Sequence, residues 1–172
     1  MKKDPLEVAR FVKAHRYPDA KVALAAGSIF RGQGTEFSDI DLVVLYDDSF
    51  EDVRRETIEV DGWPIEVFLH NIQAQNYFFH KDRERGIPVL MRMVAEGIEI
   101  PGPCEESILQ KAEAQRLIDL GPIPLDESTI LEKRYFISDL LDDLKGVKAP
   151  DERQAILAKL YLDLADLSLI HI

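Results

Sequence analysis

Residues 21–46, KVALAAGSIFRGQGTEFSDIDLVVLY, predict two strands joined by a polar connection. The apolar runs at 22–26 and 42–45 are short, rich in strand-forming residues and bounded by turn residues, which is typical of buried strands. Asp39 and Asp41 open the second run. Because side chains alternate between the two faces of a strand, both carboxylates should project from the same face.

Two carboxylates held close together repel each other and raise each other's pKa, which proteins tolerate mainly where a cation lies between them. Mg²⁺ is typically bound by one or two carboxylates together with substrate phosphates. Gly27 and Ser28 follow the first apolar run and supply backbone N–H groups and a hydroxyl, which suit a phosphate. Asp39, Asp41 and the Gly-Ser turn therefore indicate a site for nucleotide chemistry.

Residues 54–70, RRETIEVDGWPIEVFLH, predict a β-hairpin, because Asp61-Gly62 is a strong two-residue turn signal between alternating flanks. The alternation directs the apolar side chains of the second arm to the core, and Glu66 and His70 to the opposite face. Burying a glutamate without a partner is costly. Glu66 is therefore expected to reach the same metal as the aspartates, and a half-exposed strand with its polar face in water is the alternative.

The length of 172 residues favours one domain or one domain with a small second one. The net charge of −11 argues against a large nucleic-acid interface, which needs clustered Lys and Arg, and is compatible with a cationic substrate or simply with solubility. Cys104 is the only cysteine, so a reducing, cytoplasmic location is expected. Neither a signal peptide nor an apolar run of about 20 residues, as a membrane span requires, is recognisable.

The predicted fold class is α+β, with a small mixed β-sheet flanked by helices and followed by an all-helical C-terminal bundle. The Pro- and Gly-rich break at 99–103 separates a domain at 1–100 from a helical domain at 104–172. Helical periodicity or start signals place helices at residues 5–16, 72–85, 88–95, 105–120, 127–145 and from 151 onward.

The last predicted helix is apolar on more than one side, which bears on assembly. It is expected to pack either on a second copy of the chain, forming a homodimer, or back on its own domain. The apolar face consists of Ile156, Leu160, Leu164 and Leu167 and continues through Leu169, Ile170 and Ile172.

Gly27-Ser28 followed by Asp39-Ile40-Asp41 resembles the signature of the nucleotidyltransferase superfamily typified by DNA polymerase β, in which a Gly-Ser turn precedes an Asp-x-Asp flanked by apolar residues. The Arg31-Gly32 and Ser38-Asp39 elements are most similar to its small prokaryotic branch. That branch holds aminoglycoside and lincosamide nucleotidyltransferases and the minimal nucleotidyltransferases that partner helical toxins. The close resemblance covers residues 27–42, the hairpin agrees more loosely, and the helical half agrees in class alone.

The resemblance implies that Asp39 and Asp41 hold two Mg²⁺ ions and that Glu66 is the third carboxylate. Two ions clamp the attacking and leaving oxygens of an in-line displacement, and Glu66 could also take the proton of an acceptor hydroxyl. Asp61 is a rival third carboxylate, ranked lower because the hairpin turn explains it. The other implied roles are phosphate contacts by Gly27, Ser28 and Arg31, and orientation of the aspartate loop by Ser38.

The implied activity is Mg²⁺-dependent transfer of a nucleoside monophosphate from an NTP, taken to be ATP, to a hydroxyl with release of pyrophosphate. A small-molecule acceptor is expected, and the negative charge favours an aminoglycoside-like cation over a nucleic acid. The alternative is an antitoxin-type protein that binds or adenylylates a helical toxin. A third possibility, a binding module without activity, is disfavoured because Asp39, Asp41 and Glu66 are all present.

Overall fold

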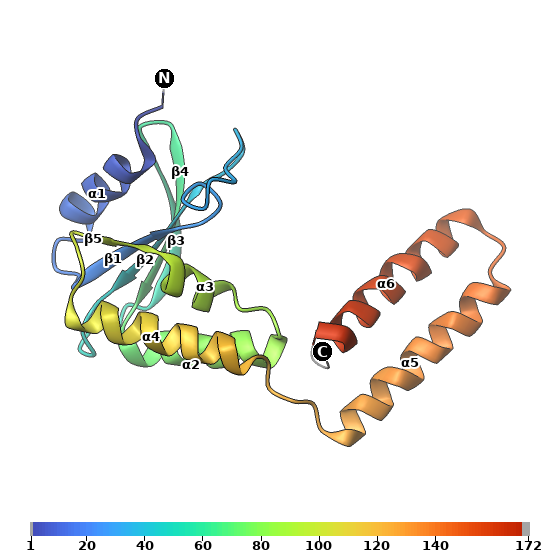
Figure 1. Ribbon diagram of the computed structural model, residues 1–172. Coiled ribbons are helices and arrows are strands. Elements are labelled where there is room, and N and C mark those ends of the chain that lie inside the picture. The colour runs from blue at the N-terminus through green and yellow to red at the C-terminus, as the bar shows by residue number, and fades with distance from the viewer. Residues whose placement is uncertain (1, 170–172) are drawn as a thin grey trace. The chain divides into compact units, whose positions relative to one another are not determined.

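The computed structural model describes residues 2–169 (Figure 1). The chain forms two compact units, Met1–Gly121 and Pro122–Ile172, each of which is described by itself. The α+β class is confirmed, since a mixed sheet with flanking helices is followed by helices α4 to α6. Ile170 and Ile172, which the sequence adds to the last apolar face, lie outside the described residues.

The sheet of the first unit has five strands in the order β3-β4-β2-β1-β5. Strands β2 and β4 are parallel, and the other neighbouring pairs are antiparallel. The parallel pair places the predicted hairpin beside the predicted aspartate strand. The strands are β1 (Val22–Ala26), β2 (Ile40–Leu45), β3 (Arg54–Val60), β4 (Trp63–His70) and β5 (Ile98–Ile100).

Strand β5 is a difference from the sequence prediction, which placed Glu99 and Ile100 in the break between domains. The strand is three residues long and pairs with β1 along the edge of the sheet. A run this short is too brief to display an alternating pattern. The following helix, α4 (Glu105–Leu120), has the predicted bounds.

Helices cover both faces of the sheet (Figure 1). Helix α1 (Pro5–Arg16) packs on one face, whereas α2 (Ile72–Arg85), α3 (Val89–Glu96) and α4 pack on the other. Alternation along β2 sends its even-numbered residues toward α1 and therefore leaves Asp41 on the face of α2, α3 and α4. The Glu66 face of β4 is thus partly covered by helices, and does not simply face water.

Helix α4 belongs to the first unit, so the compact units divide at Gly121 and not near residue 104, where the sequence placed the boundary. Ala114 of α4 is fully buried in the same core cluster as Phe79 of α2 and Val94 of α3. Gln110 of α4 accepts a hydrogen bond from buried Gln75 of α2 at 2.9 Å. An amphipathic pattern shows which helix face is apolar, but it does not show which surface covers that face.

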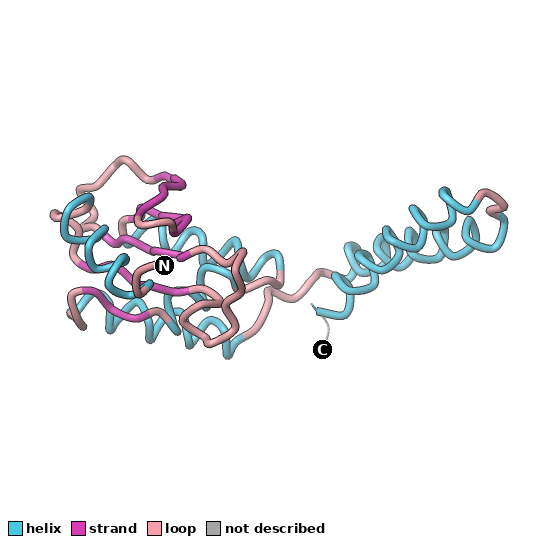
Figure 2. The backbone as a smooth tube through the Cα atoms, turned by 90° about the horizontal axis from the view of Figure 1, so that it is seen from above, coloured by secondary structure: helices cyan, strands magenta, loops and turns pink. Residues whose placement is uncertain are grey.

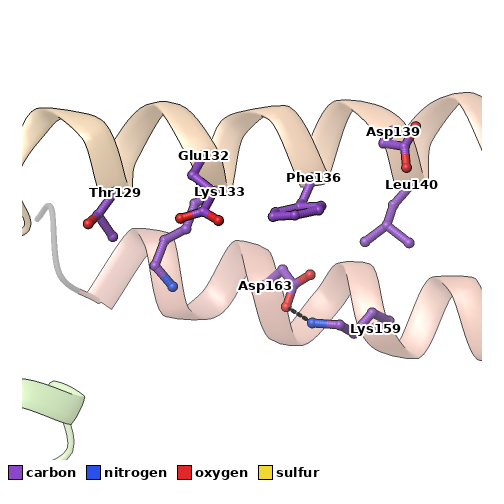
Figure 3. A pocket seen from close by; sticks show the side chains of 8 residues that line it. All are labelled: Thr129, Glu132, Lys133, Phe136, Asp139, Leu140, Lys159 and Asp163. Carbon is purple, nitrogen blue, oxygen red and sulfur yellow. Dashed lines mark hydrogen bonds and ion pairs between the residues drawn. The ribbon is translucent and has the colours of Figure 1, made fainter.

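The second unit is a helical hairpin of α5 (Glu127–Gly146) and α6 (Pro150–Leu169), which run side by side (Figure 2). Among its described side chains, Ile137 and Leu160 are the buried apolar ones. A cavity of about 540 Å³ lies between the two helices. Figure 3 shows Phe136 of α5 pointing into it, opposite the ion pair of Lys159 and Asp163 on α6. None of the helices within residues 2–169 combines the length and hydrophobicity needed to span a membrane.

Asp82 holds the junction between α2 and α3. Its side chain is 1% exposed and accepts hydrogen bonds from the backbone N–H groups of Leu90 at 2.6 Å and Met91 at 3.2 Å. It also pairs with Arg85. The residue at the cap position of α3, Pro88, makes no side-chain capping hydrogen bond, so Asp82 supplies the cap from a neighbouring helix.

We expect Asp82→Ala to lower the free energy of unfolding by about 2–3 kcal/mol, because it leaves two buried N–H groups without an acceptor. Urea denaturation followed by circular dichroism measures the change. Asp4→Ala is the control, since Asp4 caps α1 in the same way but at an exposed site, and its loss should cost about 1 kcal/mol. An Asp82 variant no less stable than the Asp4 variant would contradict the assignment.

Candidate active site

Asp39, Asp41 and Glu66 form an acidic triad whose carboxylates each offer an oxygen within 4.8 Å of the other two. Asp41 and Glu66 are register partners on the parallel strands β2 and β4, so their side chains project from the same face next to each other. Asp39 lies directly before β2, two residues from Asp41. The structure therefore brings together the three carboxylates that the sequence singled out.

The triad concentrates negative charge at a partly buried position. Burial, followed by the charges of Asp39 and Glu66, raises the pKa of Asp41 from 3.8 to about 6. Arg31 and Arg55 act in the opposite direction. Carboxylates at this spacing, with oxygen as the donor atom throughout, suit a hard divalent cation such as Mg²⁺.

The raised pKa of Asp41 leads to a pH-dependent prediction for the metal-free protein. The folded state retains this proton up to about pH 6, whereas the unfolded chain releases it near 3.8. Protonated Asp41 therefore contributes to the stability of the folded state. This contribution is fully present below pH 3.8 and is lost as the pH rises through 6. In EDTA, Asp41→Asn should gain thermal stability relative to wild type between pH 4 and pH 7, and differential scanning fluorimetry measures this gain.

Adding Mg²⁺ in the same experiment should make the wild type more stable than Asp41→Asn, because a bound cation favours the ionised carboxylate. We therefore expect Mg²⁺ to raise the Tm of the wild type more at pH 7 than at pH 5, and to leave that of Asp41→Asn nearly unchanged. A difference in Tm between the two proteins that is independent of both pH and Mg²⁺ would contradict this account.

Gly27 and Asp41 are in close contact, which explains the need for glycine at this turn. Gly27 directly follows β1 and has φ +100, a conformation that L side chains rarely adopt. A Cβ atom at this position would lie 2.5 Å from Oδ2 of Asp41. The backbone of the Gly-Ser turn thus lies directly against the triad, where a phosphate bridging to a metal would be expected.

Ser38 connects the Gly-Ser turn to the aspartate loop. Its Oγ accepts hydrogen bonds from Oγ of Ser28 at 3.0 Å and from the backbone N–H of Thr35 at 2.9 Å. The backbone oxygen of Ser28 in turn accepts from Gln33 at 2.9 Å. These hydrogen bonds tie the Gly-Ser turn to the residue directly before Asp39, and the orienting role of Ser38 stays a prediction.

A groove of about 490 Å³ opens beside Gly27 and Asp41. Arg31 lines it and lies 3.5 Å from Glu96, measured between Nη1 and Oε2. Arg92 of α3 also lines the groove, although sequence reasoning did not single it out, because only the packing of α3 over the sheet brings it there. The groove is lined by Gly27, Arg31, Gln33, Asp41, Val89, Arg92, Met93 and Glu96.

Two residues that the sequence weighed for the site have other roles or surroundings. Asp61 has φ +51 in the hairpin turn and pairs with Lys3 at 2.9 Å, so it is not the third carboxylate. His70, which the sequence placed on the same face as Glu66, is 5% exposed and therefore buried. Burial lowers the pKa of His70 to about 4, so the ring is neutral at physiological pH.

Comparison with known proteins adds an independent finding. Residues 7–89 match the nucleotidyltransferase domain family. No similar sequence was found among curated proteins. The chain is also similar to the crystal structure of a nucleotidyltransferase-like protein from Exiguobacterium sibiricum 255-15, with a TM-score of 0.48 and 16% identity. The similarity covers 94% of this chain and 51% of that protein, so the chain spans about half of its length.

Proposed function

We propose that this chain, whose residues 7–89 belong to the nucleotidyltransferase domain family, transfers a nucleoside monophosphate from an NTP to a hydroxyl of a small molecule. ATP is the expected NTP, and pyrophosphate is the second product. The observation that carries the proposal is the convergence of Asp39, Asp41 and Glu66 within 4.8 Å, directly beside the Gly-Ser turn.

The triad fits Mg²⁺, because its donors are three carboxylates, and because burial and the charges of Asp39 and Glu66 outweigh Arg31 and Arg55 and disfavour the ionised form of Asp41. We propose that Asp39, Asp41 and Glu66 hold two ions. Bound Mg²⁺ would stabilise the charge that develops on the phosphoryl oxygens during an in-line displacement.

The chain's own residues divide the remaining tasks. The backbone of Gly27 and the hydroxyl of Ser28 would hold the phosphates, and Arg31 would add a charged contact from the groove. In the reaction, the acceptor oxygen bonds to the α-phosphorus while the bond to the β-phosphate oxygen breaks. Glu66 would accept the proton that the acceptor hydroxyl releases.

An aminoglycoside-like cation remains a proposed acceptor, because the net charge of −11 would steer a cation toward the protein. Incubation with Mg²⁺, α-labelled NTPs and a panel of cationic, neutral and anionic hydroxyl compounds tests the proposal. We expect label on a small molecule and release of pyrophosphate. Label on a co-expressed helical toxin instead would favour the antitoxin alternative, and no binding of Mg-NTP by calorimetry would overturn nucleotidyl transfer to either acceptor.

We also propose that the helical hairpin packs on another protein surface, with a second copy of the chain as the first candidate and a helical protein as the alternative. Exposed apolar side chains on both helices support this, since a stable hairpin normally covers most of its apolar surface. A light-scattering mass of one chain at micromolar concentration would exclude the homodimer. The exposed residues are Leu131, Tyr135, Phe136, Leu141, Leu157, Tyr161, Leu162 and Leu164.

A further inference from the structure

The acidic triad lies between two pockets of the first unit. Asp41 lines the groove beside Gly27, whereas Glu66 lines a second pocket of about 460 Å³. Val89 and Met93 of α3 line both, so the two pockets adjoin beneath this helix. A molecule in the second pocket would therefore meet the triad from the Glu66 side.

In-line displacement makes the second pocket the place for the acceptor. The attacking and leaving oxygens lie on opposite sides of the phosphorus. Phosphates held by Gly27 and Arg31 would occupy the groove that Asp41 lines, which leaves the pocket that Glu66 lines for the incoming hydroxyl. This step rests on the proposed function, because that reaction defines the acceptor.

Aromatic side chains form much of the wall of this second pocket. The rings of His70 and Phe78 are stacked, with centroids 5.0 Å apart and an interplanar angle of 20°. Phe68 lies next to them and contacts His70 edge-on. The buried Nδ1 of His70 has no hydrogen-bond partner among the described residues. Such a wall favours a flat, apolar ring over a heavily hydrated polycation.

Two arginines that line the pocket, Arg85 and Arg55, differ in the carboxylates with which they pair. Arg85 is paired with the buried capping residue Asp82. Arg55, which is 62% exposed, is paired with Glu66 and lies over the face of Phe68, with Cζ 5.0 Å from the ring centroid. Glu66 is a proposed metal ligand, and a bound cation would compete with Arg55 for its charge. Arg55 would then present an unpaired guanidinium at the mouth of an aromatic pocket.

We propose that the second pocket binds the acceptor and that this acceptor carries an aromatic ring and an anionic group bound by Arg55. Guanidinium groups pair well with carboxylates and phosphates and stack on aromatic faces. The overall negative charge of the chain favours a cation only during long-range approach. The groups that line the pocket determine what stays bound, and here they favour an anion.

Two probes that share a phenol ring test the proposal, namely 4-hydroxyphenylacetate, with an anionic tail, and tyramine, with a cationic one. Their dissociation constants are measured on the full chain by calorimetry, with Mg²⁺ and a non-hydrolysable ATP analogue present. We expect the anion to bind about tenfold more tightly than the cation, as a charge-assisted hydrogen bond allows. Phe78→Ala should weaken both probes equally.

Variants of Arg55 show whether the carboxylate of 4-hydroxyphenylacetate binds to Arg55 or directly to the metal. Arg55→Gln should abolish the preference for the anion, and Arg55→Lys should retain part of it. Arg10→Gln on α1, an exposed arginine outside both pockets, should change neither affinity. Equal binding of the two probes to the wild type, or a preference that survives in Arg55→Gln, would overturn the proposal.

Binding of the ATP analogue, recorded in the same titrations, distinguishes a failure of the proposed acceptor class from a failure of the proposed function. If the analogue binds and the probes show no preference, the assigned acceptor class is wrong and the proposed function stands. If the analogue fails to bind in the presence of Mg²⁺, the proposed function fails, and with it the identification of the pocket as an acceptor site.

Discussion

Asp41→Asn is expected to lower the rate of nucleotidyl transfer by at least about a thousandfold while the protein stays folded. Asp41 is central to the triad, being the register partner of Glu66 and lying two residues after Asp39. Asparagine retains nearly the same volume but loses the charge, and an amide oxygen is a weaker ligand for Mg²⁺ than a carboxylate. The rate is measured as labelled product formed from α-labelled ATP at saturating Mg²⁺.

The loss should not come from unfolding, because Asn removes a carboxylate whose ionised form is disfavoured by burial and by two neighbouring negative charges. A Tm at pH 7 in EDTA equal to or above that of the wild type would establish this. Asp61→Asn is the matched control, since Asn tolerates the φ of +51 in the hairpin turn. An Asp41 variant as active as the Asp61 variant would contradict the assignment of the metal site.

Much of the site could be predicted from sequence because its signals are local. The bounds of β1 follow from a continuous apolar run that ends at a turn. The placement of Asp39 and Asp41 on one face follows from a period of two along an extended chain. The hairpin turn follows from Asp61-Gly62, whose two residues both have positive φ. The family match over residues 7–89 confirms the resemblance that these local patterns carried.

The position of Glu66 depended on a contact that no local pattern encodes. Its approach to Asp41 requires that β2 and β4 pair in parallel. These strands are neighbours in the sheet, but β3 lies between them in the sequence. The sequence pointed to Glu66 through the cost of burying an unpaired glutamate and through the resemblance. Neither argument reveals Arg55, which comes from β3 and reaches Glu66 across the hairpin.

The same limit explains the features that sequence reasoning missed. The groove residue Arg92 and the aromatic neighbours of His70 come together only when α2 and α3 pack on the sheet. Net charge is limited in a comparable way, because it does not show where the charges lie. A total of −11 describes the average surface, whereas Arg54, Arg55 and Arg85 line the pocket beside Glu66. Local electrostatics depends on which side chains the fold brings together.

Gly27→Ala is expected to reduce nucleotidyl transfer by about 100-fold or more, because it combines backbone strain with displacement of a triad carboxylate. The added Cβ would lie 2.5 Å from Oδ2 of Asp41, far inside contact distance. Either Asp41 moves away from Glu66 or the turn opens, and both outcomes disturb the phosphate and metal positions. The φ of +100 adds strain, so stability should fall by about 1–3 kcal/mol.

Gly32→Ala separates the two effects. Gly32 also has positive φ, at +72, but a Cβ at this position would meet no atom within 4 Å. This variant should therefore lose stability through strain alone, while its affinity for Mg²⁺ and its rate stay close to those of the wild type. Calorimetric titration with Mg²⁺ and the transfer assay compare the two variants under the same conditions. If both glycine variants lose activity equally, Gly27 contributes only its backbone conformation, and the close approach of the turn to Asp41 has no part in catalysis.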